Sequence, residues 1–239
     1  MPQKWSHPAE MVNDAERLAA VRATGLLASP SEEAFDRLTK LATRITGAPV
    51  SFFSVIDADH DFFKSCYGAP EPVATARRVT GRSFCHFTVL GTAPLLVSDA
   101  RTDERYKELP SVKQLGVVAY LGIPLHLASG HALGSFCVVD FQTRTWDPEQ
   151  VEILAEFAKS TLREVELRIA RADEHTMKDR LTSQIRDPLT ALHLHTDLIE
   201  DAVDLDQVRT HVSRMRDSLH RIESFVVRVL GVGSGERVG

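Results

Sequence analysis

The chain has 239 residues, of which 43% are hydrophobic and 26% are charged, an ordinary composition for a folded protein. This length allows one domain of about 150 residues and a smaller one. The formal net charge of -5, without a run of Lys and Arg, argues against nucleic acid as the main ligand, because phosphate binding depends on these residues. No apolar run approaches the roughly 20 residues that span a bilayer, so no membrane insertion is expected. Three cysteines are too few for a disulfide scaffold and indicate a reducing, cytoplasmic location.

The first fifty residues predict a flexible arm and two helices. Residues 1–11 have no periodic pattern and form the arm. A helix is expected from about Asn13 to Leu27, and Ser29 with Glu32 has the spacing of a capping box that opens the second helix. Apolar residues of this second helix recur at spacings of three and four before Gly47 ends it. They are Phe35, Leu38, Leu41, Ala42 and Ile45.

Five strand-like segments follow, separated by loops and one short helix. The apolar, β-branched and aromatic composition predicts strands at 50–57, 62–68, 94–99, 118–127 and 131–140. A short helix fits 83–90, and the polar stretch 100–110 is expected to be loop and turn. Helices followed by strands with an inserted helical region predict an α+β domain.

The second half of the chain predicts helix almost throughout. Asp147 followed by Pro148 is typical of a helix start, and the helical pattern continues to about Glu200, with Pro188 expected to kink it. The early part of this helix has the four-and-three rhythm of a coiled-coil seam. A last helix continues the same rhythm for three heptads and predicts a dimerisation seam. Its residues are Val208, Val212, Met215, Leu219, Ile222, Val226 and Val229.

Two amphipathic helices joined by a short turn at 201–206 predict an antiparallel hairpin. One hairpin buries its apolar stripe poorly, whereas two hairpins from different chains form a four-helix bundle with two-fold symmetry. A homodimer is therefore expected. The alternative is a hairpin that folds back onto the sheet domain of its own chain. The narrow stripe disfavours it, because a helix on a globular core usually has a wider apolar face.

Seven motifs, taken in order, resemble the GAF family, in the subgroup often found at the front of bacterial sensor kinases. They are NDAERLAAVRATGLL, EEAFDRLTKLATRITGAPVSFFSVIDAD, SFCHFTVLG, PLLVSDARTDERY, YLGIPL, HALGSFCVVD and WDPEQVEILAEFA. The resemblance implies a GAF-type antiparallel sheet with flanking helices over 12–168, which senses a small molecule or simply dimerises. Residues 147–178 would form a connecting signalling helix that overlaps its end. No specific cofactor is predicted, and a small-molecule ligand of unknown identity stays open.

The segment LTSQIRDPLTAL resembles the phosphoacceptor helix of sensor histidine kinases, which usually reads Ser-His-Glu-Leu-Arg-Thr-Pro-Leu. Alignment on Arg186 and Pro188 places Ser183 at the histidine position and Gln184 at the acid position. A histidine nucleophile and its carboxylate are both absent there. The resemblance implies a dimerisation and docking hairpin (DHp-like) over 179–230, with Arg186, Asp187 and Pro188 as docking residues. Residues 231–239 are expected to be a flexible tail, too short for an ATP-binding domain.

Four other histidines of the helical half are candidates for a displaced phosphoacceptor. They are His193, His195, His211 and His220. The alternative for each is a structural or surface role.

The candidate ligand-binding residues of the GAF segment are Cys85, His86, Asp99, Arg101, Tyr120 and Cys137. The subgroup commonly has Ser-Phe-Cys-Ala-His-Thr, whereas residues 83–88 here have the histidine one place early. A ligand role of the later histidine is therefore not transferred. The Cys-His pair also resembles the chromophore attachment motif of phytochromes. In that family the pair follows the segment equivalent to VSDARTDERY, whereas here it precedes this segment, which disfavours a bilin chromophore.

Two hypotheses remain for the cysteines and for the charged loop. Cys85 and Cys137 are a redox thiol pair if the fold brings them together, or buried cysteines that act as small hydrophobes. Asp99 and Arg101 grip a polar ligand or form a local salt bridge. No metal is predicted, because two histidines near a turn, His126 and His131, lack a third ligand.

The predicted function is that of a non-catalytic signal-transduction protein. Its GAF sensor would be coupled to a degenerate kinase hairpin that modulates a response regulator or a sensor histidine kinase. The alternative is a histidine phosphotransfer protein or a remnant histidine kinase that uses a displaced histidine. A methionine sulfoxide reductase of the GAF type is a third reading that the arrangement of the cysteines disfavours.

Overall fold

A six-stranded antiparallel sheet with the strand order β3-β2-β1-β6-β5-β4 organises the first part of the chain. The computed structural model describes residue 10 and residues 12–200 and 202–230. The strands are β1 (Val50–Ile56), β2 (His60–Tyr67), β3 (Arg78–Thr80), β4 (Leu95–Val97), β5 (Ala119–His126) and β6 (Ala132–Asp140). The α+β class and the five predicted strands are confirmed. The sixth, β3, has three residues, which is too short to show a periodic pattern.

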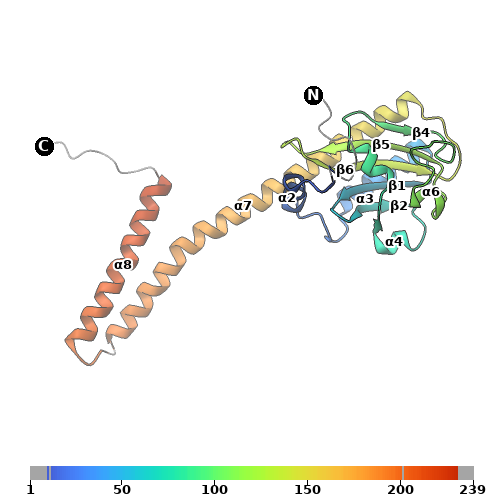
Figure 1. Ribbon diagram of the computed structural model, residues 1–239. Helices are drawn as coiled ribbons and strands as arrows, with labels where there is room; N and C mark the ends of the chain where they lie inside the picture. Colours follow the sequence, from blue (N-terminus) through green and yellow to red (C-terminus); the bar gives the residue numbers. More distant parts are fainter. Residues whose placement is uncertain (1–9, 11, 201, 231–239) are drawn as a thin grey trace. The chain divides into compact units, whose positions relative to one another are not determined.

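Helices cover both faces of the sheet (Figure 1). Each face carries its own apolar cluster. Helices α2 (Ala15–Ala23) and α3 (Glu33–Thr46) and the first part of α7 (Pro148–Glu200) cover one face. The short helices α4 (Val73–Ala76), α5 (Phe84–Thr88) and α6 (Pro110–Lys113) lie over the other. Because both faces are buried, the central strands β1 and β6 are buried at every residue and read as continuous apolar runs.

Helix α2 is attached to the sheet by a buried arginine. The Asp14 carboxylate caps the helix by accepting the backbone N–H of Arg17 at 2.8 Å. The Arg17 side chain is 2% exposed, and its guanidinium donates to the carbonyls of Ile56 at 2.8 Å and Val12 at 2.7 Å. Burial lowers the pKa of Arg17, and the negative charges of Asp57 and Asp14 oppose this shift. The buried Arg17 side chain therefore fixes the helix to the end of β1.

The capping box predicted from Ser29 and Glu32 is wrong. Helix α3 starts after Glu32 without a side-chain cap, and Ser29 Oγ donates instead to the carbonyl of Leu26 at 2.6 Å. Ser29 Oγ also accepts a hydrogen bond from Lys64 Nζ at 2.7 Å. Glu32 pairs with Lys64, whose side chain is fully buried. Ser29 and Glu32 therefore bind the buried ammonium group of Lys64 instead of capping helix α3.

The buried face of α3 also differs from the prediction. Thr39, Thr43 and Thr46 are buried, whereas Ile45 is 47% exposed. Thr39 Oγ1 and Ser65 Oγ lie 2.8 Å apart across the α3–β2 contact, and Ser65 Oγ donates to Asp36 at 2.6 Å. Hydrogen bonding makes burial of these hydroxyls acceptable. Gly47 ends the helix with a φ of 71°, as predicted.

The chain divides into two compact units, Met1–Ala170 and Arg171–Gly239. Helix α7 belongs to both units and runs through Pro188 without a break in the assigned helix. In the second unit its C-terminal part is followed by α8 (Leu205–Leu230), and the two run alongside each other (Figure 1). The two predicted helices are confirmed, although α8 begins at Leu205, inside the predicted turn, while the DHp-like identity of the hairpin, the dimer and the four-helix bundle stay predictions.

The predicted seam of α8 is divided between two sides of the helix. Val208, Met215 and Ile222 are half-buried within the unit, and Ser218 and Phe225 are buried beside them. Other seam residues stay substantially exposed in the single chain: Val212, Leu219, Val226 and Val229. The sequence therefore predicts the stripe correctly, but α7 covers only one side of it.

The predicted arm at 1–11 and tail at 231–239 lie outside the described residues, apart from Glu10. Within the described part of the chain, no helix is both long and apolar enough to cross a membrane.

Candidate functional site

A cavity of about 60 Å³ lies between the sheet and the segment that carries α4, α5 and α6. By the usual measure of roughly 10–15 Å³ per enclosed water, it has room for about four to six water molecules, or a compact organic molecule. Its walls are mostly apolar and include several aromatic rings. The lining residues are Val50, Phe52, Asp61, Phe63, Pro70, Val73, Val79, Ser83, Phe84, Cys85, Ser111, Leu115, Val117, Tyr120, Cys137, Val139 and Phe141.

Ser111 is the polar residue of the wall whose bonding is incomplete. It is 9% exposed, and its Oγ has no hydrogen-bond partner among the described residues. A buried hydroxyl without a partner is unusual in folded proteins.

Three of the predicted ligand-binding residues meet at the wall of this cavity. Cys85 Sγ lies 4.0 Å from Cys137 Sγ, and the Tyr120 hydroxyl lies 3.8 Å from Cys85 Sγ. Burial raises the pKa of Tyr120 and that of Cys137 well above their ordinary values. Both groups therefore keep their protons at neutral pH. The Tyr120 hydroxyl also lies 2.7 Å from Thr88 Oγ1, which fixes α5 against β5.

His86 has a structural role instead of facing the cavity. It is 6% exposed, and its Nδ1 accepts the backbone N–H of Ser83 at 3.2 Å, while Ser83 Oγ accepts the N–H of Cys85 at 3.2 Å. These bonds form a capping box at the start of α5. Burial lowers the pKa of His86, and Asp61 opposes this shift. The early histidine of this chain thus closes a helix end.

Ser83, His86 and Asp61 have the residue types of a catalytic triad, and Ser83 Oγ lies 3.1 Å from His86 Nδ1, but the serine hydroxyl donates its hydrogen bond to Asp61 and not to the histidine. Ser83 Oγ donates to Asp61 Oδ2 in a short hydrogen bond, and Ser54 Oγ donates to Asp61 Oδ1 at 2.6 Å. In a working triad the carboxylate orients the histidine and the histidine takes the proton of the serine. Here the carboxylate binds the serine itself, so the group holds β1, β2 and α5 together.

Asp99 and Arg101 form a local ion pair outside the cavity wall. Arg101 Nη2 lies 2.6 Å from Asp99 Oδ2, and Thr143 Oγ1 donates to the same oxygen at 3.1 Å. The hydrogen bond from Arg101 holds the pKa of Asp99 well below its usual range. Of the two hypotheses for this loop, the geometry matches the local salt bridge.

Sequence reasoning missed most of the aromatic wall. Phe52, Phe63 and Phe141 were not singled out, although they lie two residues from other lining positions, Val50, Asp61 and Val139. Alternate residues of a strand share one face, so this spacing was a usable signal. The unbroken apolar runs of β1 and β6 concealed it.

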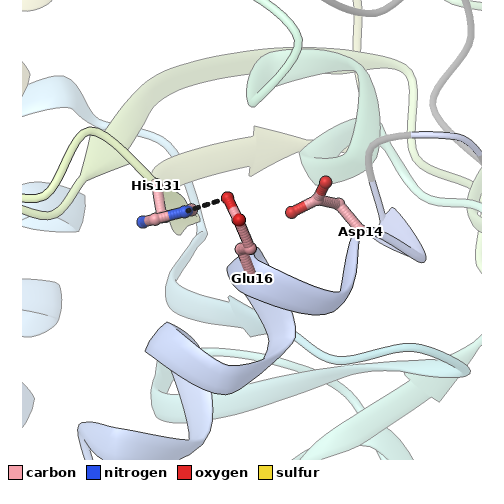
Figure 2. Close-up of side chains that lie close together, drawn as sticks. All are labelled: Asp14, Glu16 and His131. Carbon is pink, nitrogen blue, oxygen red and sulfur yellow. Dashed lines mark ion pairs between the residues drawn. The ribbon is translucent and has the colours of Figure 1, made fainter.

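Two groups on the surface of the first unit have the composition of a metal site. Asp14, Glu16 and His131 have ligand atoms within 4.8 Å of one another (Figure 2), and so do Asp57, Asp59 and His60. Glu16 Oε2 lies 3.9 Å from His131 Nε2, but the Asp14 carboxylate already caps α2. Exposed acidic groups are common without an ion, and we assign no metal to either group.

In the helical unit, the two degenerate phosphoacceptor positions line a groove between α7 and α8. The groove is lined by Ser183, Gln184, Asp187, Pro188, His220, Arg221, Ser224, Phe225 and Arg228. Ser183 Oγ donates to the carbonyl of Arg180 at 3.1 Å, an ordinary helical bond that does not activate a nucleophile. Arg186 belongs to a second groove on α7, together with Ile185 and His193. The three predicted docking residues thus divide between two grooves.

The remaining histidines have different surroundings. His193 is exposed, with Nδ1 3.0 Å from the carbonyl of Leu189. His195 and His211 are half-buried and bring their Nδ1 atoms within 3.2 Å of each other across the hairpin. His220 is 78% exposed and lies 3.9 Å from a Glu223 carboxylate oxygen.

An antiparallel sheet with helices on both faces and an apolar cavity on one of them defines a small α+β sensor-type domain. The GAF domain model matches residues 30–162, more than half of the chain, so the chain belongs to the GAF domain family. GAF domains are generally regulatory sensors, and this part of the predicted function is confirmed.

Among proteins of known function, a cyclic di-GMP phosphodiesterase of Pseudomonas aeruginosa is 33% identical over 187 residues. The match covers 77% of this chain but 29% of that relative.

Solved structures with the same fold include a domain of a protein named as a two-component sensor histidine kinase from Sinorhizobium meliloti. It is 18% identical with a TM-score of 0.50, and the match covers 60% of this chain and 97% of that one. The GAF domain of Thermosynechococcus elongatus PixJ is 13% identical, also with a TM-score of 0.50, over 70% of this chain and 98% of its own. At these identities the similarity demonstrates the fold alone.

Proposed function

We propose that the chain is a non-catalytic, cytoplasmic signalling protein in which the GAF domain senses a small molecule and the helical hairpin dimerises. The dimer docks a response regulator or a sensor histidine kinase of a two-component system. The three cysteines are free, which agrees with a reducing compartment. The phosphodiesterase activity in the relative's name is not part of the proposal, because this chain matches 29% of that protein.

The exposed apolar row on α8 is the observation that carries this proposal. Leu205, Val212, Leu219 and Val226 recur every seventh residue and are 75%, 43%, 50% and 39% exposed. The neighbouring row is covered by α7 of the same chain. A second hairpin, packed against this exposed heptad row, would bury it in a four-helix bundle.

The size of this row indicates how much of the hairpin must take part. Complete burial of a Val or Leu side chain contributes about 1.5–3 kcal/mol, so burying the exposed half of four of them contributes roughly 4 kcal/mol per chain. The cost of association is itself about 4–15 kcal/mol. The row on α8 therefore needs help from α7, where Ile185 and Leu189 are 38% and 42% exposed.

The arrangement at Ser183 supports a docking role without phosphotransfer. Its hydroxyl is bonded within its own helix, and Gln184 has no carboxylate to take up a proton. The groove around these two residues still offers Arg221 and Arg228, which a carboxylate or phosphoryl group of a partner would find favourable.

Sedimentation velocity on the purified chain tests the dimer. We expect a dimer at micromolar concentration and a monomer for Leu219→Lys, because the charge falls in the exposed row. Ser213→Lys places the same charge at an exposed polar position of α8 and is expected to stay dimeric. A monomeric parent, or equal effects of the two variants, would contradict the proposal.

Incubation with a labelled phospho-regulator and its kinase tests the absence of catalysis. Acid-labile label on this chain would refute the non-catalytic role and favour the alternative of histidine phosphotransfer. His220 is the residue we would then assign, because it lines the same groove as Ser183 and has Glu223 beside it. In that case His220→Gln would remove the label, and His193→Gln would retain it.

A further inference from the structure

Two cysteines from distant segments meet at the wall of the cavity. Cys85 stands at the start of α5 and Cys137 in the middle of β6, 52 residues later, yet their sulfurs are 4.0 Å apart. Cys85 is 5% exposed and Cys137 is fully buried. A disulfide bond is about 2.05 Å long, so the sulfurs need to approach by only about 2 Å. The third cysteine, Cys66, belongs to β2 and does not line the cavity.

The cavity determines which oxidants can reach these thiols. Its 60 Å³ admit a molecule of a few heavy atoms, and its apolar wall disfavours ions. Hydrogen peroxide is small and uncharged and meets both conditions. Oxidised glutathione is far too large to enter.

The two thiols have different surroundings, which assigns them different roles. Burial raises the pKa of Cys137 well above its ordinary value, so that it remains a thiol. Cys85, at the start of α5, is 5% exposed, whereas Cys137 is fully buried within β6, so peroxide reaches the Cys85 sulfur first. We therefore assign the attack on peroxide to the Cys85 sulfur and the second step to Cys137.

We propose that Cys85 and Cys137 form a reversible, peroxide-driven disulfide that alters the ligand cavity of the GAF domain. The thiolate of Cys85 attacks one peroxide oxygen, the O–O bond breaks, and the departing hydroxide takes up a proton to become water. The resulting sulfenic acid is attacked by the sulfur of Cys137. The S–O bond breaks, and the hydroxyl leaves as a second water with the proton of Cys137.

The two thiols thus lose two electrons and the peroxide gains two. A small dithiol such as dithiothreitol reverses the bond by thiol–disulfide exchange.

The bond would join α5 directly to β6 and draw two side chains of the wall together. Both belong to the same apolar cluster as the aromatic wall, so the cavity changes shape when they move. Oxidation is therefore coupled to whatever the cavity binds.

Thiol counting and mass spectrometry on the full-length folded chain test the proposal. After peroxide treatment, quenching and alkylation in denaturant, we expect one reactive thiol per chain instead of three. We also expect a mass lower by two hydrogens and a cross-linked peptide pair containing Cys85 and Cys137. Dithiothreitol should restore all three thiols. Cys66→Ser is the matched control and should form the same cross-link.

Single variants separate the two roles. Cys137→Ala should stop at the sulfenic acid of Cys85, detected as a dimedone adduct, while Cys85→Ala should leave Cys137 unmodified. Circular dichroism identifies a variant that fails to fold. In that case the thiol count and the cross-linked peptide of the parent chain still test the proposal. Three thiols that persist in excess peroxide, or a cross-link through Cys66, would overturn the proposal.

Discussion

The buried ion pair of Lys64 and Glu32 makes an asymmetric prediction about stability. Lys64 has a fully buried side chain whose Nζ lies 2.5 Å from a Glu32 oxygen and donates to the carbonyl of Pro30 at 2.6 Å. Glu32 is 35% exposed and has a second cationic partner, Arg168. Removal of the lysine therefore leaves a carboxylate that is still paired and hydrated. Removal of the carboxylate leaves a buried ammonium without its counter-ion.

The magnitudes follow from this difference. Breaking a buried pair so that one charge is stranded costs about 3–5 kcal/mol, and Glu32→Gln is expected near the lower end because the amide oxygen still accepts a hydrogen bond. Lys64→Met should cost about 1–2 kcal/mol, mainly for the unsatisfied Pro30 carbonyl. Glu33→Gln removes a charge from the first turn of the same helix at an exposed position and should cost less than about 1 kcal/mol.

Urea denaturation followed by tryptophan fluorescence measures these differences, because Trp146 is buried in the first unit. Burial lowers the pKa of Lys64, while Glu32 opposes this shift, so Glu32→Gln lowers that pKa further. A lysine with a lowered folded-state pKa gains stability as the pH rises through that pKa. The deficit of Glu32→Gln should therefore shrink between pH 8 and pH 10. If Lys64→Met costs as much as Glu32→Gln or more, the reasoning is wrong.

Three further predictions use the sheet and its cavity. Gly134→Ala should destabilise the first unit by about 3–5 kcal/mol in the same urea assay, because a Cβ there would lie 1.9 Å from the Ser54 carbonyl oxygen; a loss below 1 kcal/mol would contradict this close approach. Tyr120→Phe removes the contact with Thr88 and should cost about 1 kcal/mol, with an unchanged urea midpoint as the adverse result. Burial lowers the pKa of His86, which Asp61 opposes, and also lowers the pKa of His126. Protonation of these two histidines therefore favours the unfolded chain, so the urea midpoint should fall as the pH drops from 7.5 to 5.5. A midpoint that stays constant or rises in this range would argue against buried neutral histidines.

Five of the six strands, the longer helices and the α+β class could be predicted from the sequence because they depend on local periodicity. The positions of Arg17 and Lys64 could not, since their burial depends on carbonyls and a carboxylate supplied by distant segments. The hydroxyl face of α3 was missed for the same reason. Thr39 is buried because Ser65 on β2 bonds to it, and no pattern within the helix encodes that partner.

Half of the candidate site was predictable. Cys85, Tyr120 and Cys137 were identified by resemblance and do meet at the cavity. His86 and Asp99 were identified on the same grounds and have structural roles instead. A motif locates a segment of the chain, whereas the direction of each side chain depends on the exact helix start. The histidine one place early falls on the capping position of α5 rather than on its inner face.

The seam of α8 illustrates a related limit of periodicity. Apolar residues at spacings of three and four indicate which side chains are buried. The pattern is the same whether the partner helix belongs to the same chain or to another chain. Side-chain burial separates the two cases, because Phe225 is 6% exposed within the hairpin and Leu219 is 50% exposed. Substitutions at these two positions should therefore fail differently. Truncation of Phe225 would loosen the hairpin itself, whereas a charge at Leu219 would leave the hairpin folded and act on the contact between chains.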